Sequence, residues 1–144
     1  MLYLFDGYNI LHEGEFADRR ELVDALASFV ALRGARGVVV FDGVGDDTAH
    51  RALEVRFASP ADPLIERLAA ENRGSEEVWV VSSDRAVRGT AGQETRRLAS
   101  KAFLRELASE REASEAAARG ERSQVEDALD DETRRRLERW RRNR

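Results

Sequence analysis

The chain has 144 residues, the size of one ordinary domain, and it contains no cysteine. Disulfides, thiolate metal sites and cysteine nucleophiles are therefore excluded. Its 28 acidic and 24 basic residues give a net charge of −4, whereas a general nucleic-acid-binding protein is basic. No apolar run approaches the roughly 18–20 residues of a membrane span, and Asp6 comes too early for a signal peptide. We therefore expect a soluble, cytoplasmic protein.

In the first half of the chain, apolar runs predict buried strands at 2–5 and 38–41, each followed by Asp-Gly. Between them, helically spaced apolar residues predict a helix that begins after an N-cap at Asp18 and ends near residue 32. Residues 43–50 are expected to form a loop. Alternating polarity over 53–57 predicts a half-exposed strand near an edge of the sheet.

In the second half, Asp62 as N-cap and Pro63 as first helical residue predict a helix that ends at 72–74. A third buried strand is predicted at 78–81, before Ser82-Ser83-Asp84. Residues 89–93 are expected to form a loop and 98–99 a short strand. Ser100 is the expected cap of a helix with apolar positions at Phe103, Leu104 and Leu107.

The last 35 residues form a segment of distinct composition. Residues 110–132 hold nine acids and three bases, and residues 133–144 hold one acid and seven arginines. A capping box at Ser123 and Glu126, with acids placed four residues before arginines, predicts a helix at about 124–141. We therefore divide the chain into a domain at 1–109 and a charged helical extension at 110–144.

Buried strands that alternate with helices predict an α/β fold with a mainly parallel sheet. Such sheets bind ligands beyond the carboxyl ends of their strands. The three buried strands lead to Asp6, Asp42 and Asp84, and Asp62 at a helix start can face the same edge. Clustered carboxylates repel one another unless a cation offsets them, and oxygen ligands favour Mg²⁺ or Mn²⁺. Each aspartate alone is more typical of a turn or a helix cap than of a metal site, whereas Asp6, Asp62 and Asp84 together favour a functional site.

The segment Asp6-Gly-Tyr-Asn-Ile-Leu-His12, after an N-terminal strand, resembles the opening motif of the NYN domains, a branch of the PIN-like nuclease superfamily. Further segments follow in order: Val-Val-Phe-Asp-Gly43, Val-Arg-Phe-Ala58, Ala-Asp-Pro-Leu-Ile-Glu66, Val-Val-Ser-Ser-Asp84 and Ser-Lys-Ala-Phe-Leu104. Together they resemble the bacterial YacP-like NYN proteins over about residues 1–108. That family includes a ribosome-associated endoribonuclease that cuts mRNA.

The resemblance implies a PIN-like, three-layer α/β/α fold and a divalent-metal site. It implies catalytic roles for Asp6, Asn9, Asp62 and Asp84, with Mg²⁺ or Mn²⁺ held by Asp6, Asp62 and Asp84 and, at a nearby strand end, by Asp42. Asn9 would orient a carboxylate or a metal-bound water, unless it is simply a turn residue. The implied activity is hydrolysis of RNA phosphodiester bonds, in mRNA presented by the ribosome.

Three further residues are candidates for RNA contact. Tyr8 lies beside the acidic edge and either stacks on a base or packs in the core. Arg85 and Arg88 follow Asp84 closely and either bind phosphates or remain solvated. The arginines of 134–144 are a candidate anchor on the ribosome.

Two other functions fit the same sequence. A non-catalytic RNA- or ribosome-binding module with a degenerate metal site is favoured by the acidic body and by Pro63, where related sequences often have an acid or polar residue. A small phosphatase or a flap-type DNA nuclease would use similar carboxylates.

Overall fold

The computed structural model describes residues 1–84 and 95–142 and, beyond residue 120, the side chain of Arg135 alone. The chain consists of two compact units, Met1–Glu106 and Leu107–Arg144, which are described separately. Within the described part of the chain, none of the helices combines the length and the hydropathy of a membrane-spanning segment.

A single sheet of six strands among the described residues forms the centre of the first unit, in the order β3-β4-β2-β1-β5-β6. The strands are β1 (Leu2–Asp6), β2 (Arg36–Asp42), β3 (Thr48–His50), β4 (Leu53–Ala58), β5 (Val78–Val81) and β6 (Thr95–Leu98). All neighbouring strands are parallel except β3 and β4, which form an antiparallel hairpin. The predicted α/β fold with a mainly parallel sheet is therefore confirmed.

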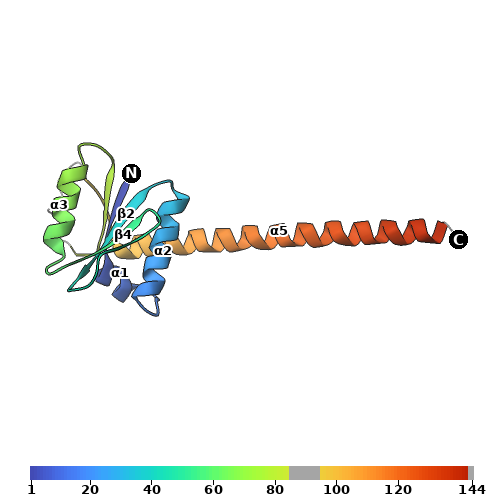
Figure 1. Cartoon of the computed structure of the whole chain (residues 1–144), viewed down its shortest axis with the longest axis horizontal. Helices are drawn as coiled ribbons and strands as arrows, with labels where there is room; N and C mark the ends of the chain where they lie inside the picture. Colours follow the sequence, from blue (N-terminus) through green and yellow to red (C-terminus); the bar gives the residue numbers. More distant parts are fainter. Residues whose placement is uncertain (85–94, 143–144) are drawn as a thin grey trace. The chain divides into compact units, whose positions relative to one another are not determined.

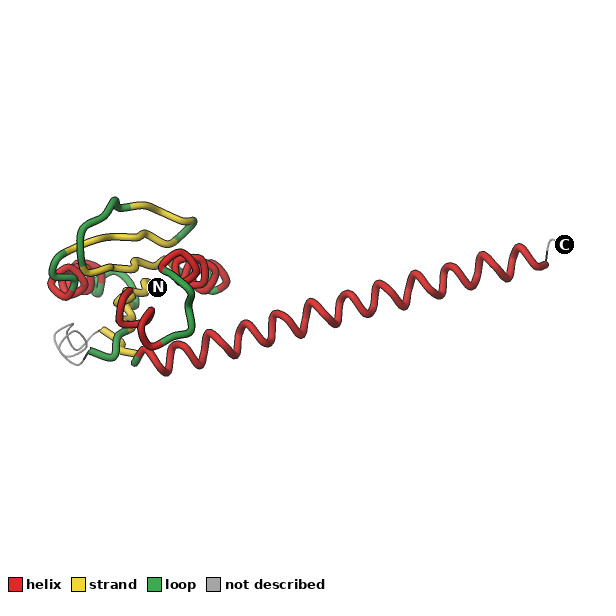
Figure 2. The backbone as a smooth tube through the Cα atoms, turned by 90° about the horizontal axis from the view of Figure 1, so that it is seen from below, coloured by secondary structure: helices red, strands yellow, loops and turns green. Residues whose placement is uncertain are grey.

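Helices cover both sides of this sheet within the first unit, to which only the start of the last helix belongs. They are α1 (Gly7–Glu13), α2 (Arg19–Leu32), α3 (Asp62–Asn72) and α5 (Ser100–Arg142). Helices α3 and α2 lie on opposite faces of the sheet (Figure 1, Figure 2). The sheet between these helices completes a three-layer α/β/α arrangement.

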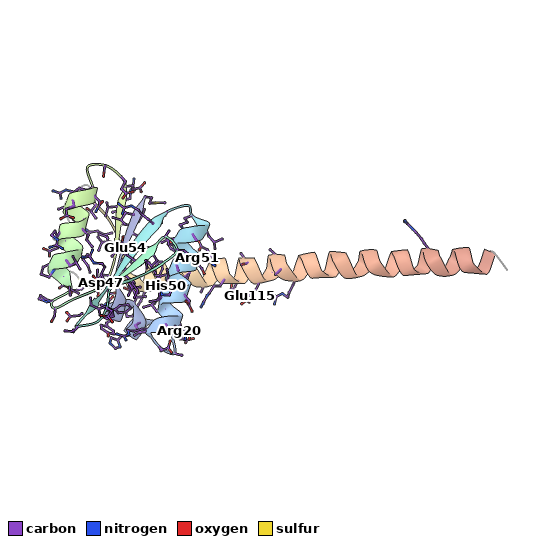
Figure 3. All side chains as sticks on the ribbon, in the orientation of Figure 1. Arg20, Asp47, His50, Arg51, Glu54 and Glu115 are labelled. Atoms are coloured by element: carbon purple, nitrogen blue, oxygen red, sulfur yellow. The ribbon has the colours of Figure 1, made fainter. Side chains whose placement is uncertain are left out.

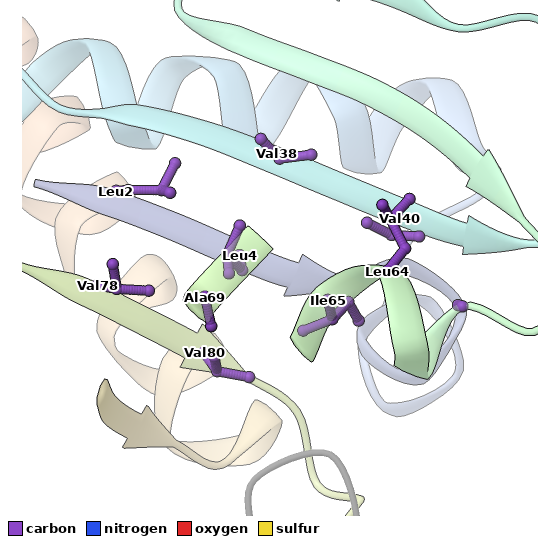
Figure 4. Packing of buried hydrophobic residues seen from close by; sticks show 10 residues of the cluster. Leu2, Leu4, Val38, Val40, Leu64, Ile65, Ala69, Val78 and Val80 are labelled. Carbon is purple, nitrogen blue, oxygen red and sulfur yellow. The ribbon is translucent and has the colours of Figure 1, made fainter. Parts of the chain in front are cut away.

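The α3 face of the sheet holds an aliphatic core. Alternate residues of β1, β2 and β5 point toward α3, as expected from the two-residue period of a strand. Figure 4 shows this cluster, which contains Leu2, Leu4, Val38, Val40, Ala61, Leu64, Ile65, Ala69, Val78 and Val80. Because each strand is buried on both faces, its sequence is a continuous apolar run.

The opposite face holds an aromatic core. The ring of Phe103, in the first turn of α5, lies 5.4 Å from that of Phe5 and 4.9 Å from that of Phe29, measured between centroids. Tyr3 completes the cluster with an edge contact to Phe29 at 5.1 Å. The start of α5 is thus held to β1 and α2 by aromatic packing.

Several predicted boundaries need correction. Residues 43–50 are not all loop, since Thr48–His50 form the edge strand β3, and α1 was not predicted. Strand β6 ends at Leu98, where a strand at 98–99 was predicted. Residues 100–142 form one continuous helix, which contains the helix predicted at 124–141. The loop predicted at 89–93 lies outside the described residues.

Of the caps predicted within residues 1–106, one was right and two were wrong, and the capping box predicted at Ser123 lies inside the continuous helix α5, so no helix begins there. Asp18 caps α2, accepting the backbone N–H of Glu21 at 2.9 Å. Asp62 is the first residue of α3 rather than its cap, because the helix begins one residue earlier than predicted and Ala61 occupies the cap position. Ser100 is likewise the first residue of α5, and the backbone carbonyl of Ala99 accepts the first helical hydrogen bond, from Phe103.

Candidate active site

Four aspartates lie at the carboxyl edge of the sheet. Asp6 and Asp42 end β1 and β2, Asp84 follows β5, and Asp62 begins α3. Strand β1 pairs with β2 on one side and with β5 on the other, so the ends of these strands are neighbours. Asp6 and Asp42 continue the alternation of Leu4 and Val40, which places both on the α3 face.

The carboxylates of Asp6, Asp62 and Asp84 lie within electrostatic reach of one another. Burial raises the pKa of Asp6; a hydrogen bond from Ser82 opposes this shift, and the charges of Asp62 and Asp84 add to it. Burial also raises the pKa of Asp62, with further contributions from the charges of Asp84, Asp42 and Glu66. The edge of the sheet therefore concentrates negative charge that a bound cation would offset.

Ser82 links two of these aspartates. Its side chain is fully buried, and its hydroxyl donates to Asp6 Oδ2 at 2.9 Å. The Oγ of Ser82 also accepts the backbone N–H of Asp84 at 3.0 Å. The Ser82 hydroxyl makes both bonds, and it thus fixes the carboxylate of Asp6 and the backbone of Asp84.

Asn9 joins three elements of the fold. Its Oδ1 accepts the backbone N–H of Ser83 at 2.8 Å and the hydroxyl of Ser100 at 2.6 Å. These bonds connect α1 to the end of β5 and to the start of α5. Because the amide oxygen already accepts two hydrogen bonds, the described geometry makes Asn9 a positioning residue.

Asp42 positions the start of α3. Its Oδ2 accepts the backbone N–H of Ala61 at 3.3 Å, immediately before Asp62. The N-cap of α3 has no side-chain hydrogen bond, so the Asp62 carboxylate is not used as the predicted cap. Asp62 is half-buried and faces the other acids, which leaves its oxygens available for a cation.

The donor chemistry of this edge suits a divalent cation. Among residues 1–84 and 95–142, no three His, Asp or Glu side chains lie close enough together to form a complete ligand set. Mg²⁺, however, commonly binds through one or two carboxylates and completes its shell with water and substrate phosphates. The carboxylates of Asp6, Asp62 and Asp84 are candidate donors for such a partial, oxygen-only site, in which one or two of them would contact the cation directly.

Of the three residues predicted to contact RNA, only Tyr8 lies within the described part of the chain. Tyr8 is half-buried; its ring packs edge-on against Phe41 at 5.1 Å, and its hydroxyl accepts from Arg19 Nη1 at 3.3 Å. The ring is therefore part of the aromatic packing, whereas Arg85 and Arg88 lie outside the described residues.

The family model of the YacP-like NYN domain matches residues 3–142. The chain belongs to this family. NYN domains are PIN-like nucleases, and such nucleases generally depend on divalent metal ions. The acidic edge of this NYN domain is accordingly its candidate nuclease site.

Two solved structures support the assignment. Rae1 (YacP) from Bacillus subtilis, as a W164L mutant, is 30% identical with a TM-score of 0.73, over 85% of this chain and 84% of that one. A second Rae1 (YacP) structure from the same organism is 28% identical with a TM-score of 0.69, over 99% and 95% of the two chains. No curated protein sequence matches the chain.

Sequence reasoning missed the parts that Ser82 and Ser100 play in this site. The sequence offered one signal for Ser82, which is a hydroxyl residue two positions before the strand-end acid Asp84. For Ser100 the only signal was its place in a motif shared with the family. Both serines are fully buried, which excludes them as simple surface caps.

Proposed function

We propose that this NYN domain is a divalent-metal-dependent endoribonuclease that hydrolyses mRNA presented by the ribosome. The observation that carries the proposal is the convergence of Asp6, Asp62 and Asp84 at one edge of the sheet, where their charges oppose one another. A structural role alone would not require three mutually repelling carboxylates. Mg²⁺ or Mn²⁺ is the cation class that such oxygens prefer.

The residues divide into ligands and positioning groups. Asp6, Asp62 and Asp84 would hold the cation, while Ser82, Asn9 and Asp42 hold the elements that carry these acids. A cation bound there would supply an activated water and neutralise charge on the phosphoryl oxygens. Without a cation, these carboxylates would repel the phosphate backbone of RNA. A phosphodiester would therefore approach them only when a bound cation offsets their charge.

Presentation by the ribosome is suggested by the similarity to the YacP-like family, and the charge of the chain supports it. The chain has a net charge of −4, so free RNA should bind weakly, without the electrostatic attraction that drives general RNA binding. The seven arginines of residues 133–144 are the proposed anchor on ribosomal RNA. The substrate would then reach the acidic edge by tethering, at a high local concentration.

The test is RNA cleavage in a ribosome-coupled translation reaction. We expect Mn²⁺-dependent cleavage by the wild type and at least about a hundredfold loss in Asp6→Asn and Asp84→Asn. Glu71→Gln is the matched control, because it removes an acid from the exposed end of α3, outside the edge. Cleavage that persists in both aspartate variants would refute the proposal.

A non-catalytic ribosome-binding module is the second candidate. It is favoured by the absence, within the described residues, of three acids close enough to form a complete metal-ligand set. Ribosome co-sedimentation separates the two. A module predicts retained binding with no cleavage that depends on Asp6.

A further inference from the structure

A concave surface lies on the α2 face of the sheet, opposite the α3 face to which Asp6 and Asp42 belong. It is a cavity of about 530 Å³ between the start of α2, the loop after β2 and the β3–β4 hairpin. We call it the α2–β3 pocket. Its volume is in the range of small-ligand sites.

The floor of the α2–β3 pocket is apolar. It is formed by Val23 of α2, Phe41 at the end of β2, and Val55 and Phe57 of β4. The rings of Phe41 and Phe57 are 5.7 Å apart between centroids. The ring planes are tilted by 32° and Phe41 is buried, so the half-buried Phe57 presents the accessible aromatic surface on which a planar ligand could stack.

The rim of the pocket carries both hydrogen-bond donors and hydrogen-bond acceptors. Arg19, Arg20 and His50 supply donors, and Asp24 and Asp46 supply acceptors; Arg20 and His50 are labelled in Figure 3. The two arginines and two aspartates cancel in formal charge. The pocket therefore suits a neutral ligand with donors and acceptors on one edge better than it suits a phosphate.

The pocket is already formed in the free chain. The guanidinium of Arg19 lies 5.3 Å from the Phe57 ring and 5.8 Å from the Phe41 ring, and it donates to Tyr8. Asp47 ties the loop after β2 to β4, accepting the Phe57 N–H at 3.0 Å and pairing with Arg56 at 3.3 Å.

The same loop packs directly on the aromatic floor. A Cβ added to Gly45 would lie 2.8 Å from three atoms of the Phe57 ring, so this close approach requires glycine. A ligand on this floor would consequently find its walls in place, at a small ordering cost.

The pocket and the acidic edge meet through adjacent residues. Phe41 precedes Asp42 on β2, and Tyr8 follows Asp6 by two residues while contacting both Phe41 and Arg19. A chain that passes over the carboxyl end of β2 can therefore reach both places. Among polymers, single-stranded RNA carries a planar, neutral, hydrogen-bonding group on each unit.

We propose that the α2–β3 pocket binds one unstacked nucleobase of the RNA strand, stacked against Arg19 and Phe57, with Phe41 buried beneath them. This inference rests on the proposed function, since it takes RNA as the substrate. It adds a subsite that would select where along the strand the phosphodiester meets the acids. Stacking on such platforms tolerates any base, whereas the rim of donors and acceptors provides preference among bases.

The test measures nucleotide binding without cleavage. Backbone amide shifts of the full chain are recorded by ¹H–¹⁵N NMR in chelator, with nucleoside monophosphates and with ribose 5-phosphate as the probe that lacks a base. We expect the amides of Gly45 and His50 to shift with the nucleotides and not with ribose 5-phosphate. We expect Arg19→Gln to weaken this binding about tenfold.

Arg67→Gln is the matched control, because it removes the same charge from an exposed position on α3. Equal weakening by the two variants, equal shifts with ribose 5-phosphate, or no shifts at these amides would overturn the inference. In the last case the exposed Val44 loop is better explained as a protein contact. Base-dependent binding together with cleavage that does not need Asp6 would instead refute the proposed function and leave the pocket standing.

Discussion

The hydroxyl of Ser82 donates to Asp6 across 2.9 Å, and its oxygen accepts the backbone N–H of Asp84 at 3.0 Å. One buried side chain therefore controls the position of two candidate ligands that come from different strands. A hydroxyl has a single proton, so donation to Asp6 leaves its lone pairs for the Asp84 amide. The two bonds support each other in this arrangement.

Ser82→Ala should affect both stability and activity. Loss of the hydroxyl leaves the Asp84 N–H and one Asp6 oxygen without this partner, which costs about 1–3 kcal/mol of unfolding free energy. The pKa of Asp6 should rise further, because the hydrogen bond that favours its charged form is lost. Urea unfolding measures the first effect, and the pH dependence of cleavage measures the second.

Ser83→Ala is the control for this variant. It removes the same atoms from the next residue, whose described hydrogen bond to Asn9 is made by the backbone. Equal effects of the two substitutions on stability and on the pH profile would contradict the role assigned to Ser82.

The raised pKa of Asp6 makes stability depend on pH. Because the folded state binds this proton more tightly than the unfolded state does, the contribution of Asp6 is present below its ordinary value of 3.8 and is lost as pH rises through the raised value. In chelator at pH 7, Asp6→Asn should therefore be at least as stable as the wild type. The difference should shrink as the pH is lowered toward 3.8.

Added Mn²⁺ should reverse that order. A cation that binds the folded wild type raises its melting temperature by mass action, whereas Asp6→Asn lacks one of the carboxylates. Thermal melts with and without Mn²⁺, across pH, check both parts. A wild type more stable than Asp6→Asn in chelator at neutral pH would show that the Asp6 charge is already balanced.

The bonds of Asn9 to Ser83 and Ser100 predict a non-additive pair of substitutions. Asn9→Ala removes the acceptor of both bonds and should cost about 2–3 kcal/mol, while Ser100→Ala removes one bond and should cost about 1 kcal/mol. Once Asn9 is gone, the Ser100 hydroxyl has already lost this partner. The double variant should therefore be more stable than the sum of the single losses predicts.

Chemical denaturation of the four proteins in this cycle provides the measurement. Strict additivity would mean that Asn9 and Ser100 contribute independently. The start of α5 would then be held by the packing of Phe103 alone rather than by its bond to the site.

The elements of the fold that could be predicted are those whose apolar residues form a continuous run or a helical stripe. Strands β1, β2 and β5 are buried on both faces and leave continuous apolar runs, and the stripe and cap of α2 are equally visible. Helix α1 has only seven residues, and β3 is an exposed three-residue strand stabilised by its hairpin partner. Such short elements depend on tertiary contacts, which local sequence does not encode.

In the candidate site, too, local sequence predicts some features, and contacts between distant residues determine the others. Parallel strands must bring their carboxyl ends together, so the positions of Asp6, Asp42 and Asp84 could be predicted without coordinates. The bonds of Ser82 to Asp6 and of Ser100 to Asn9 span 76 and 91 residues of sequence. No local pattern predicts a contact at that separation, and the α2–β3 pocket, which combines four elements, was equally beyond prediction.

The two edges of the sheet bear on how copies of this protein behave at high concentration. An unpaired strand edge is a template for intermolecular pairing, which leads to aggregation. Among the described strands, one edge is β3, with only three residues, and the other is β6, where Arg96 and Arg97 are both exposed. A short strand at one side and adjacent positive charges at the other both disfavour the addition of a further strand, so the fold protects itself against growth of the sheet from copy to copy.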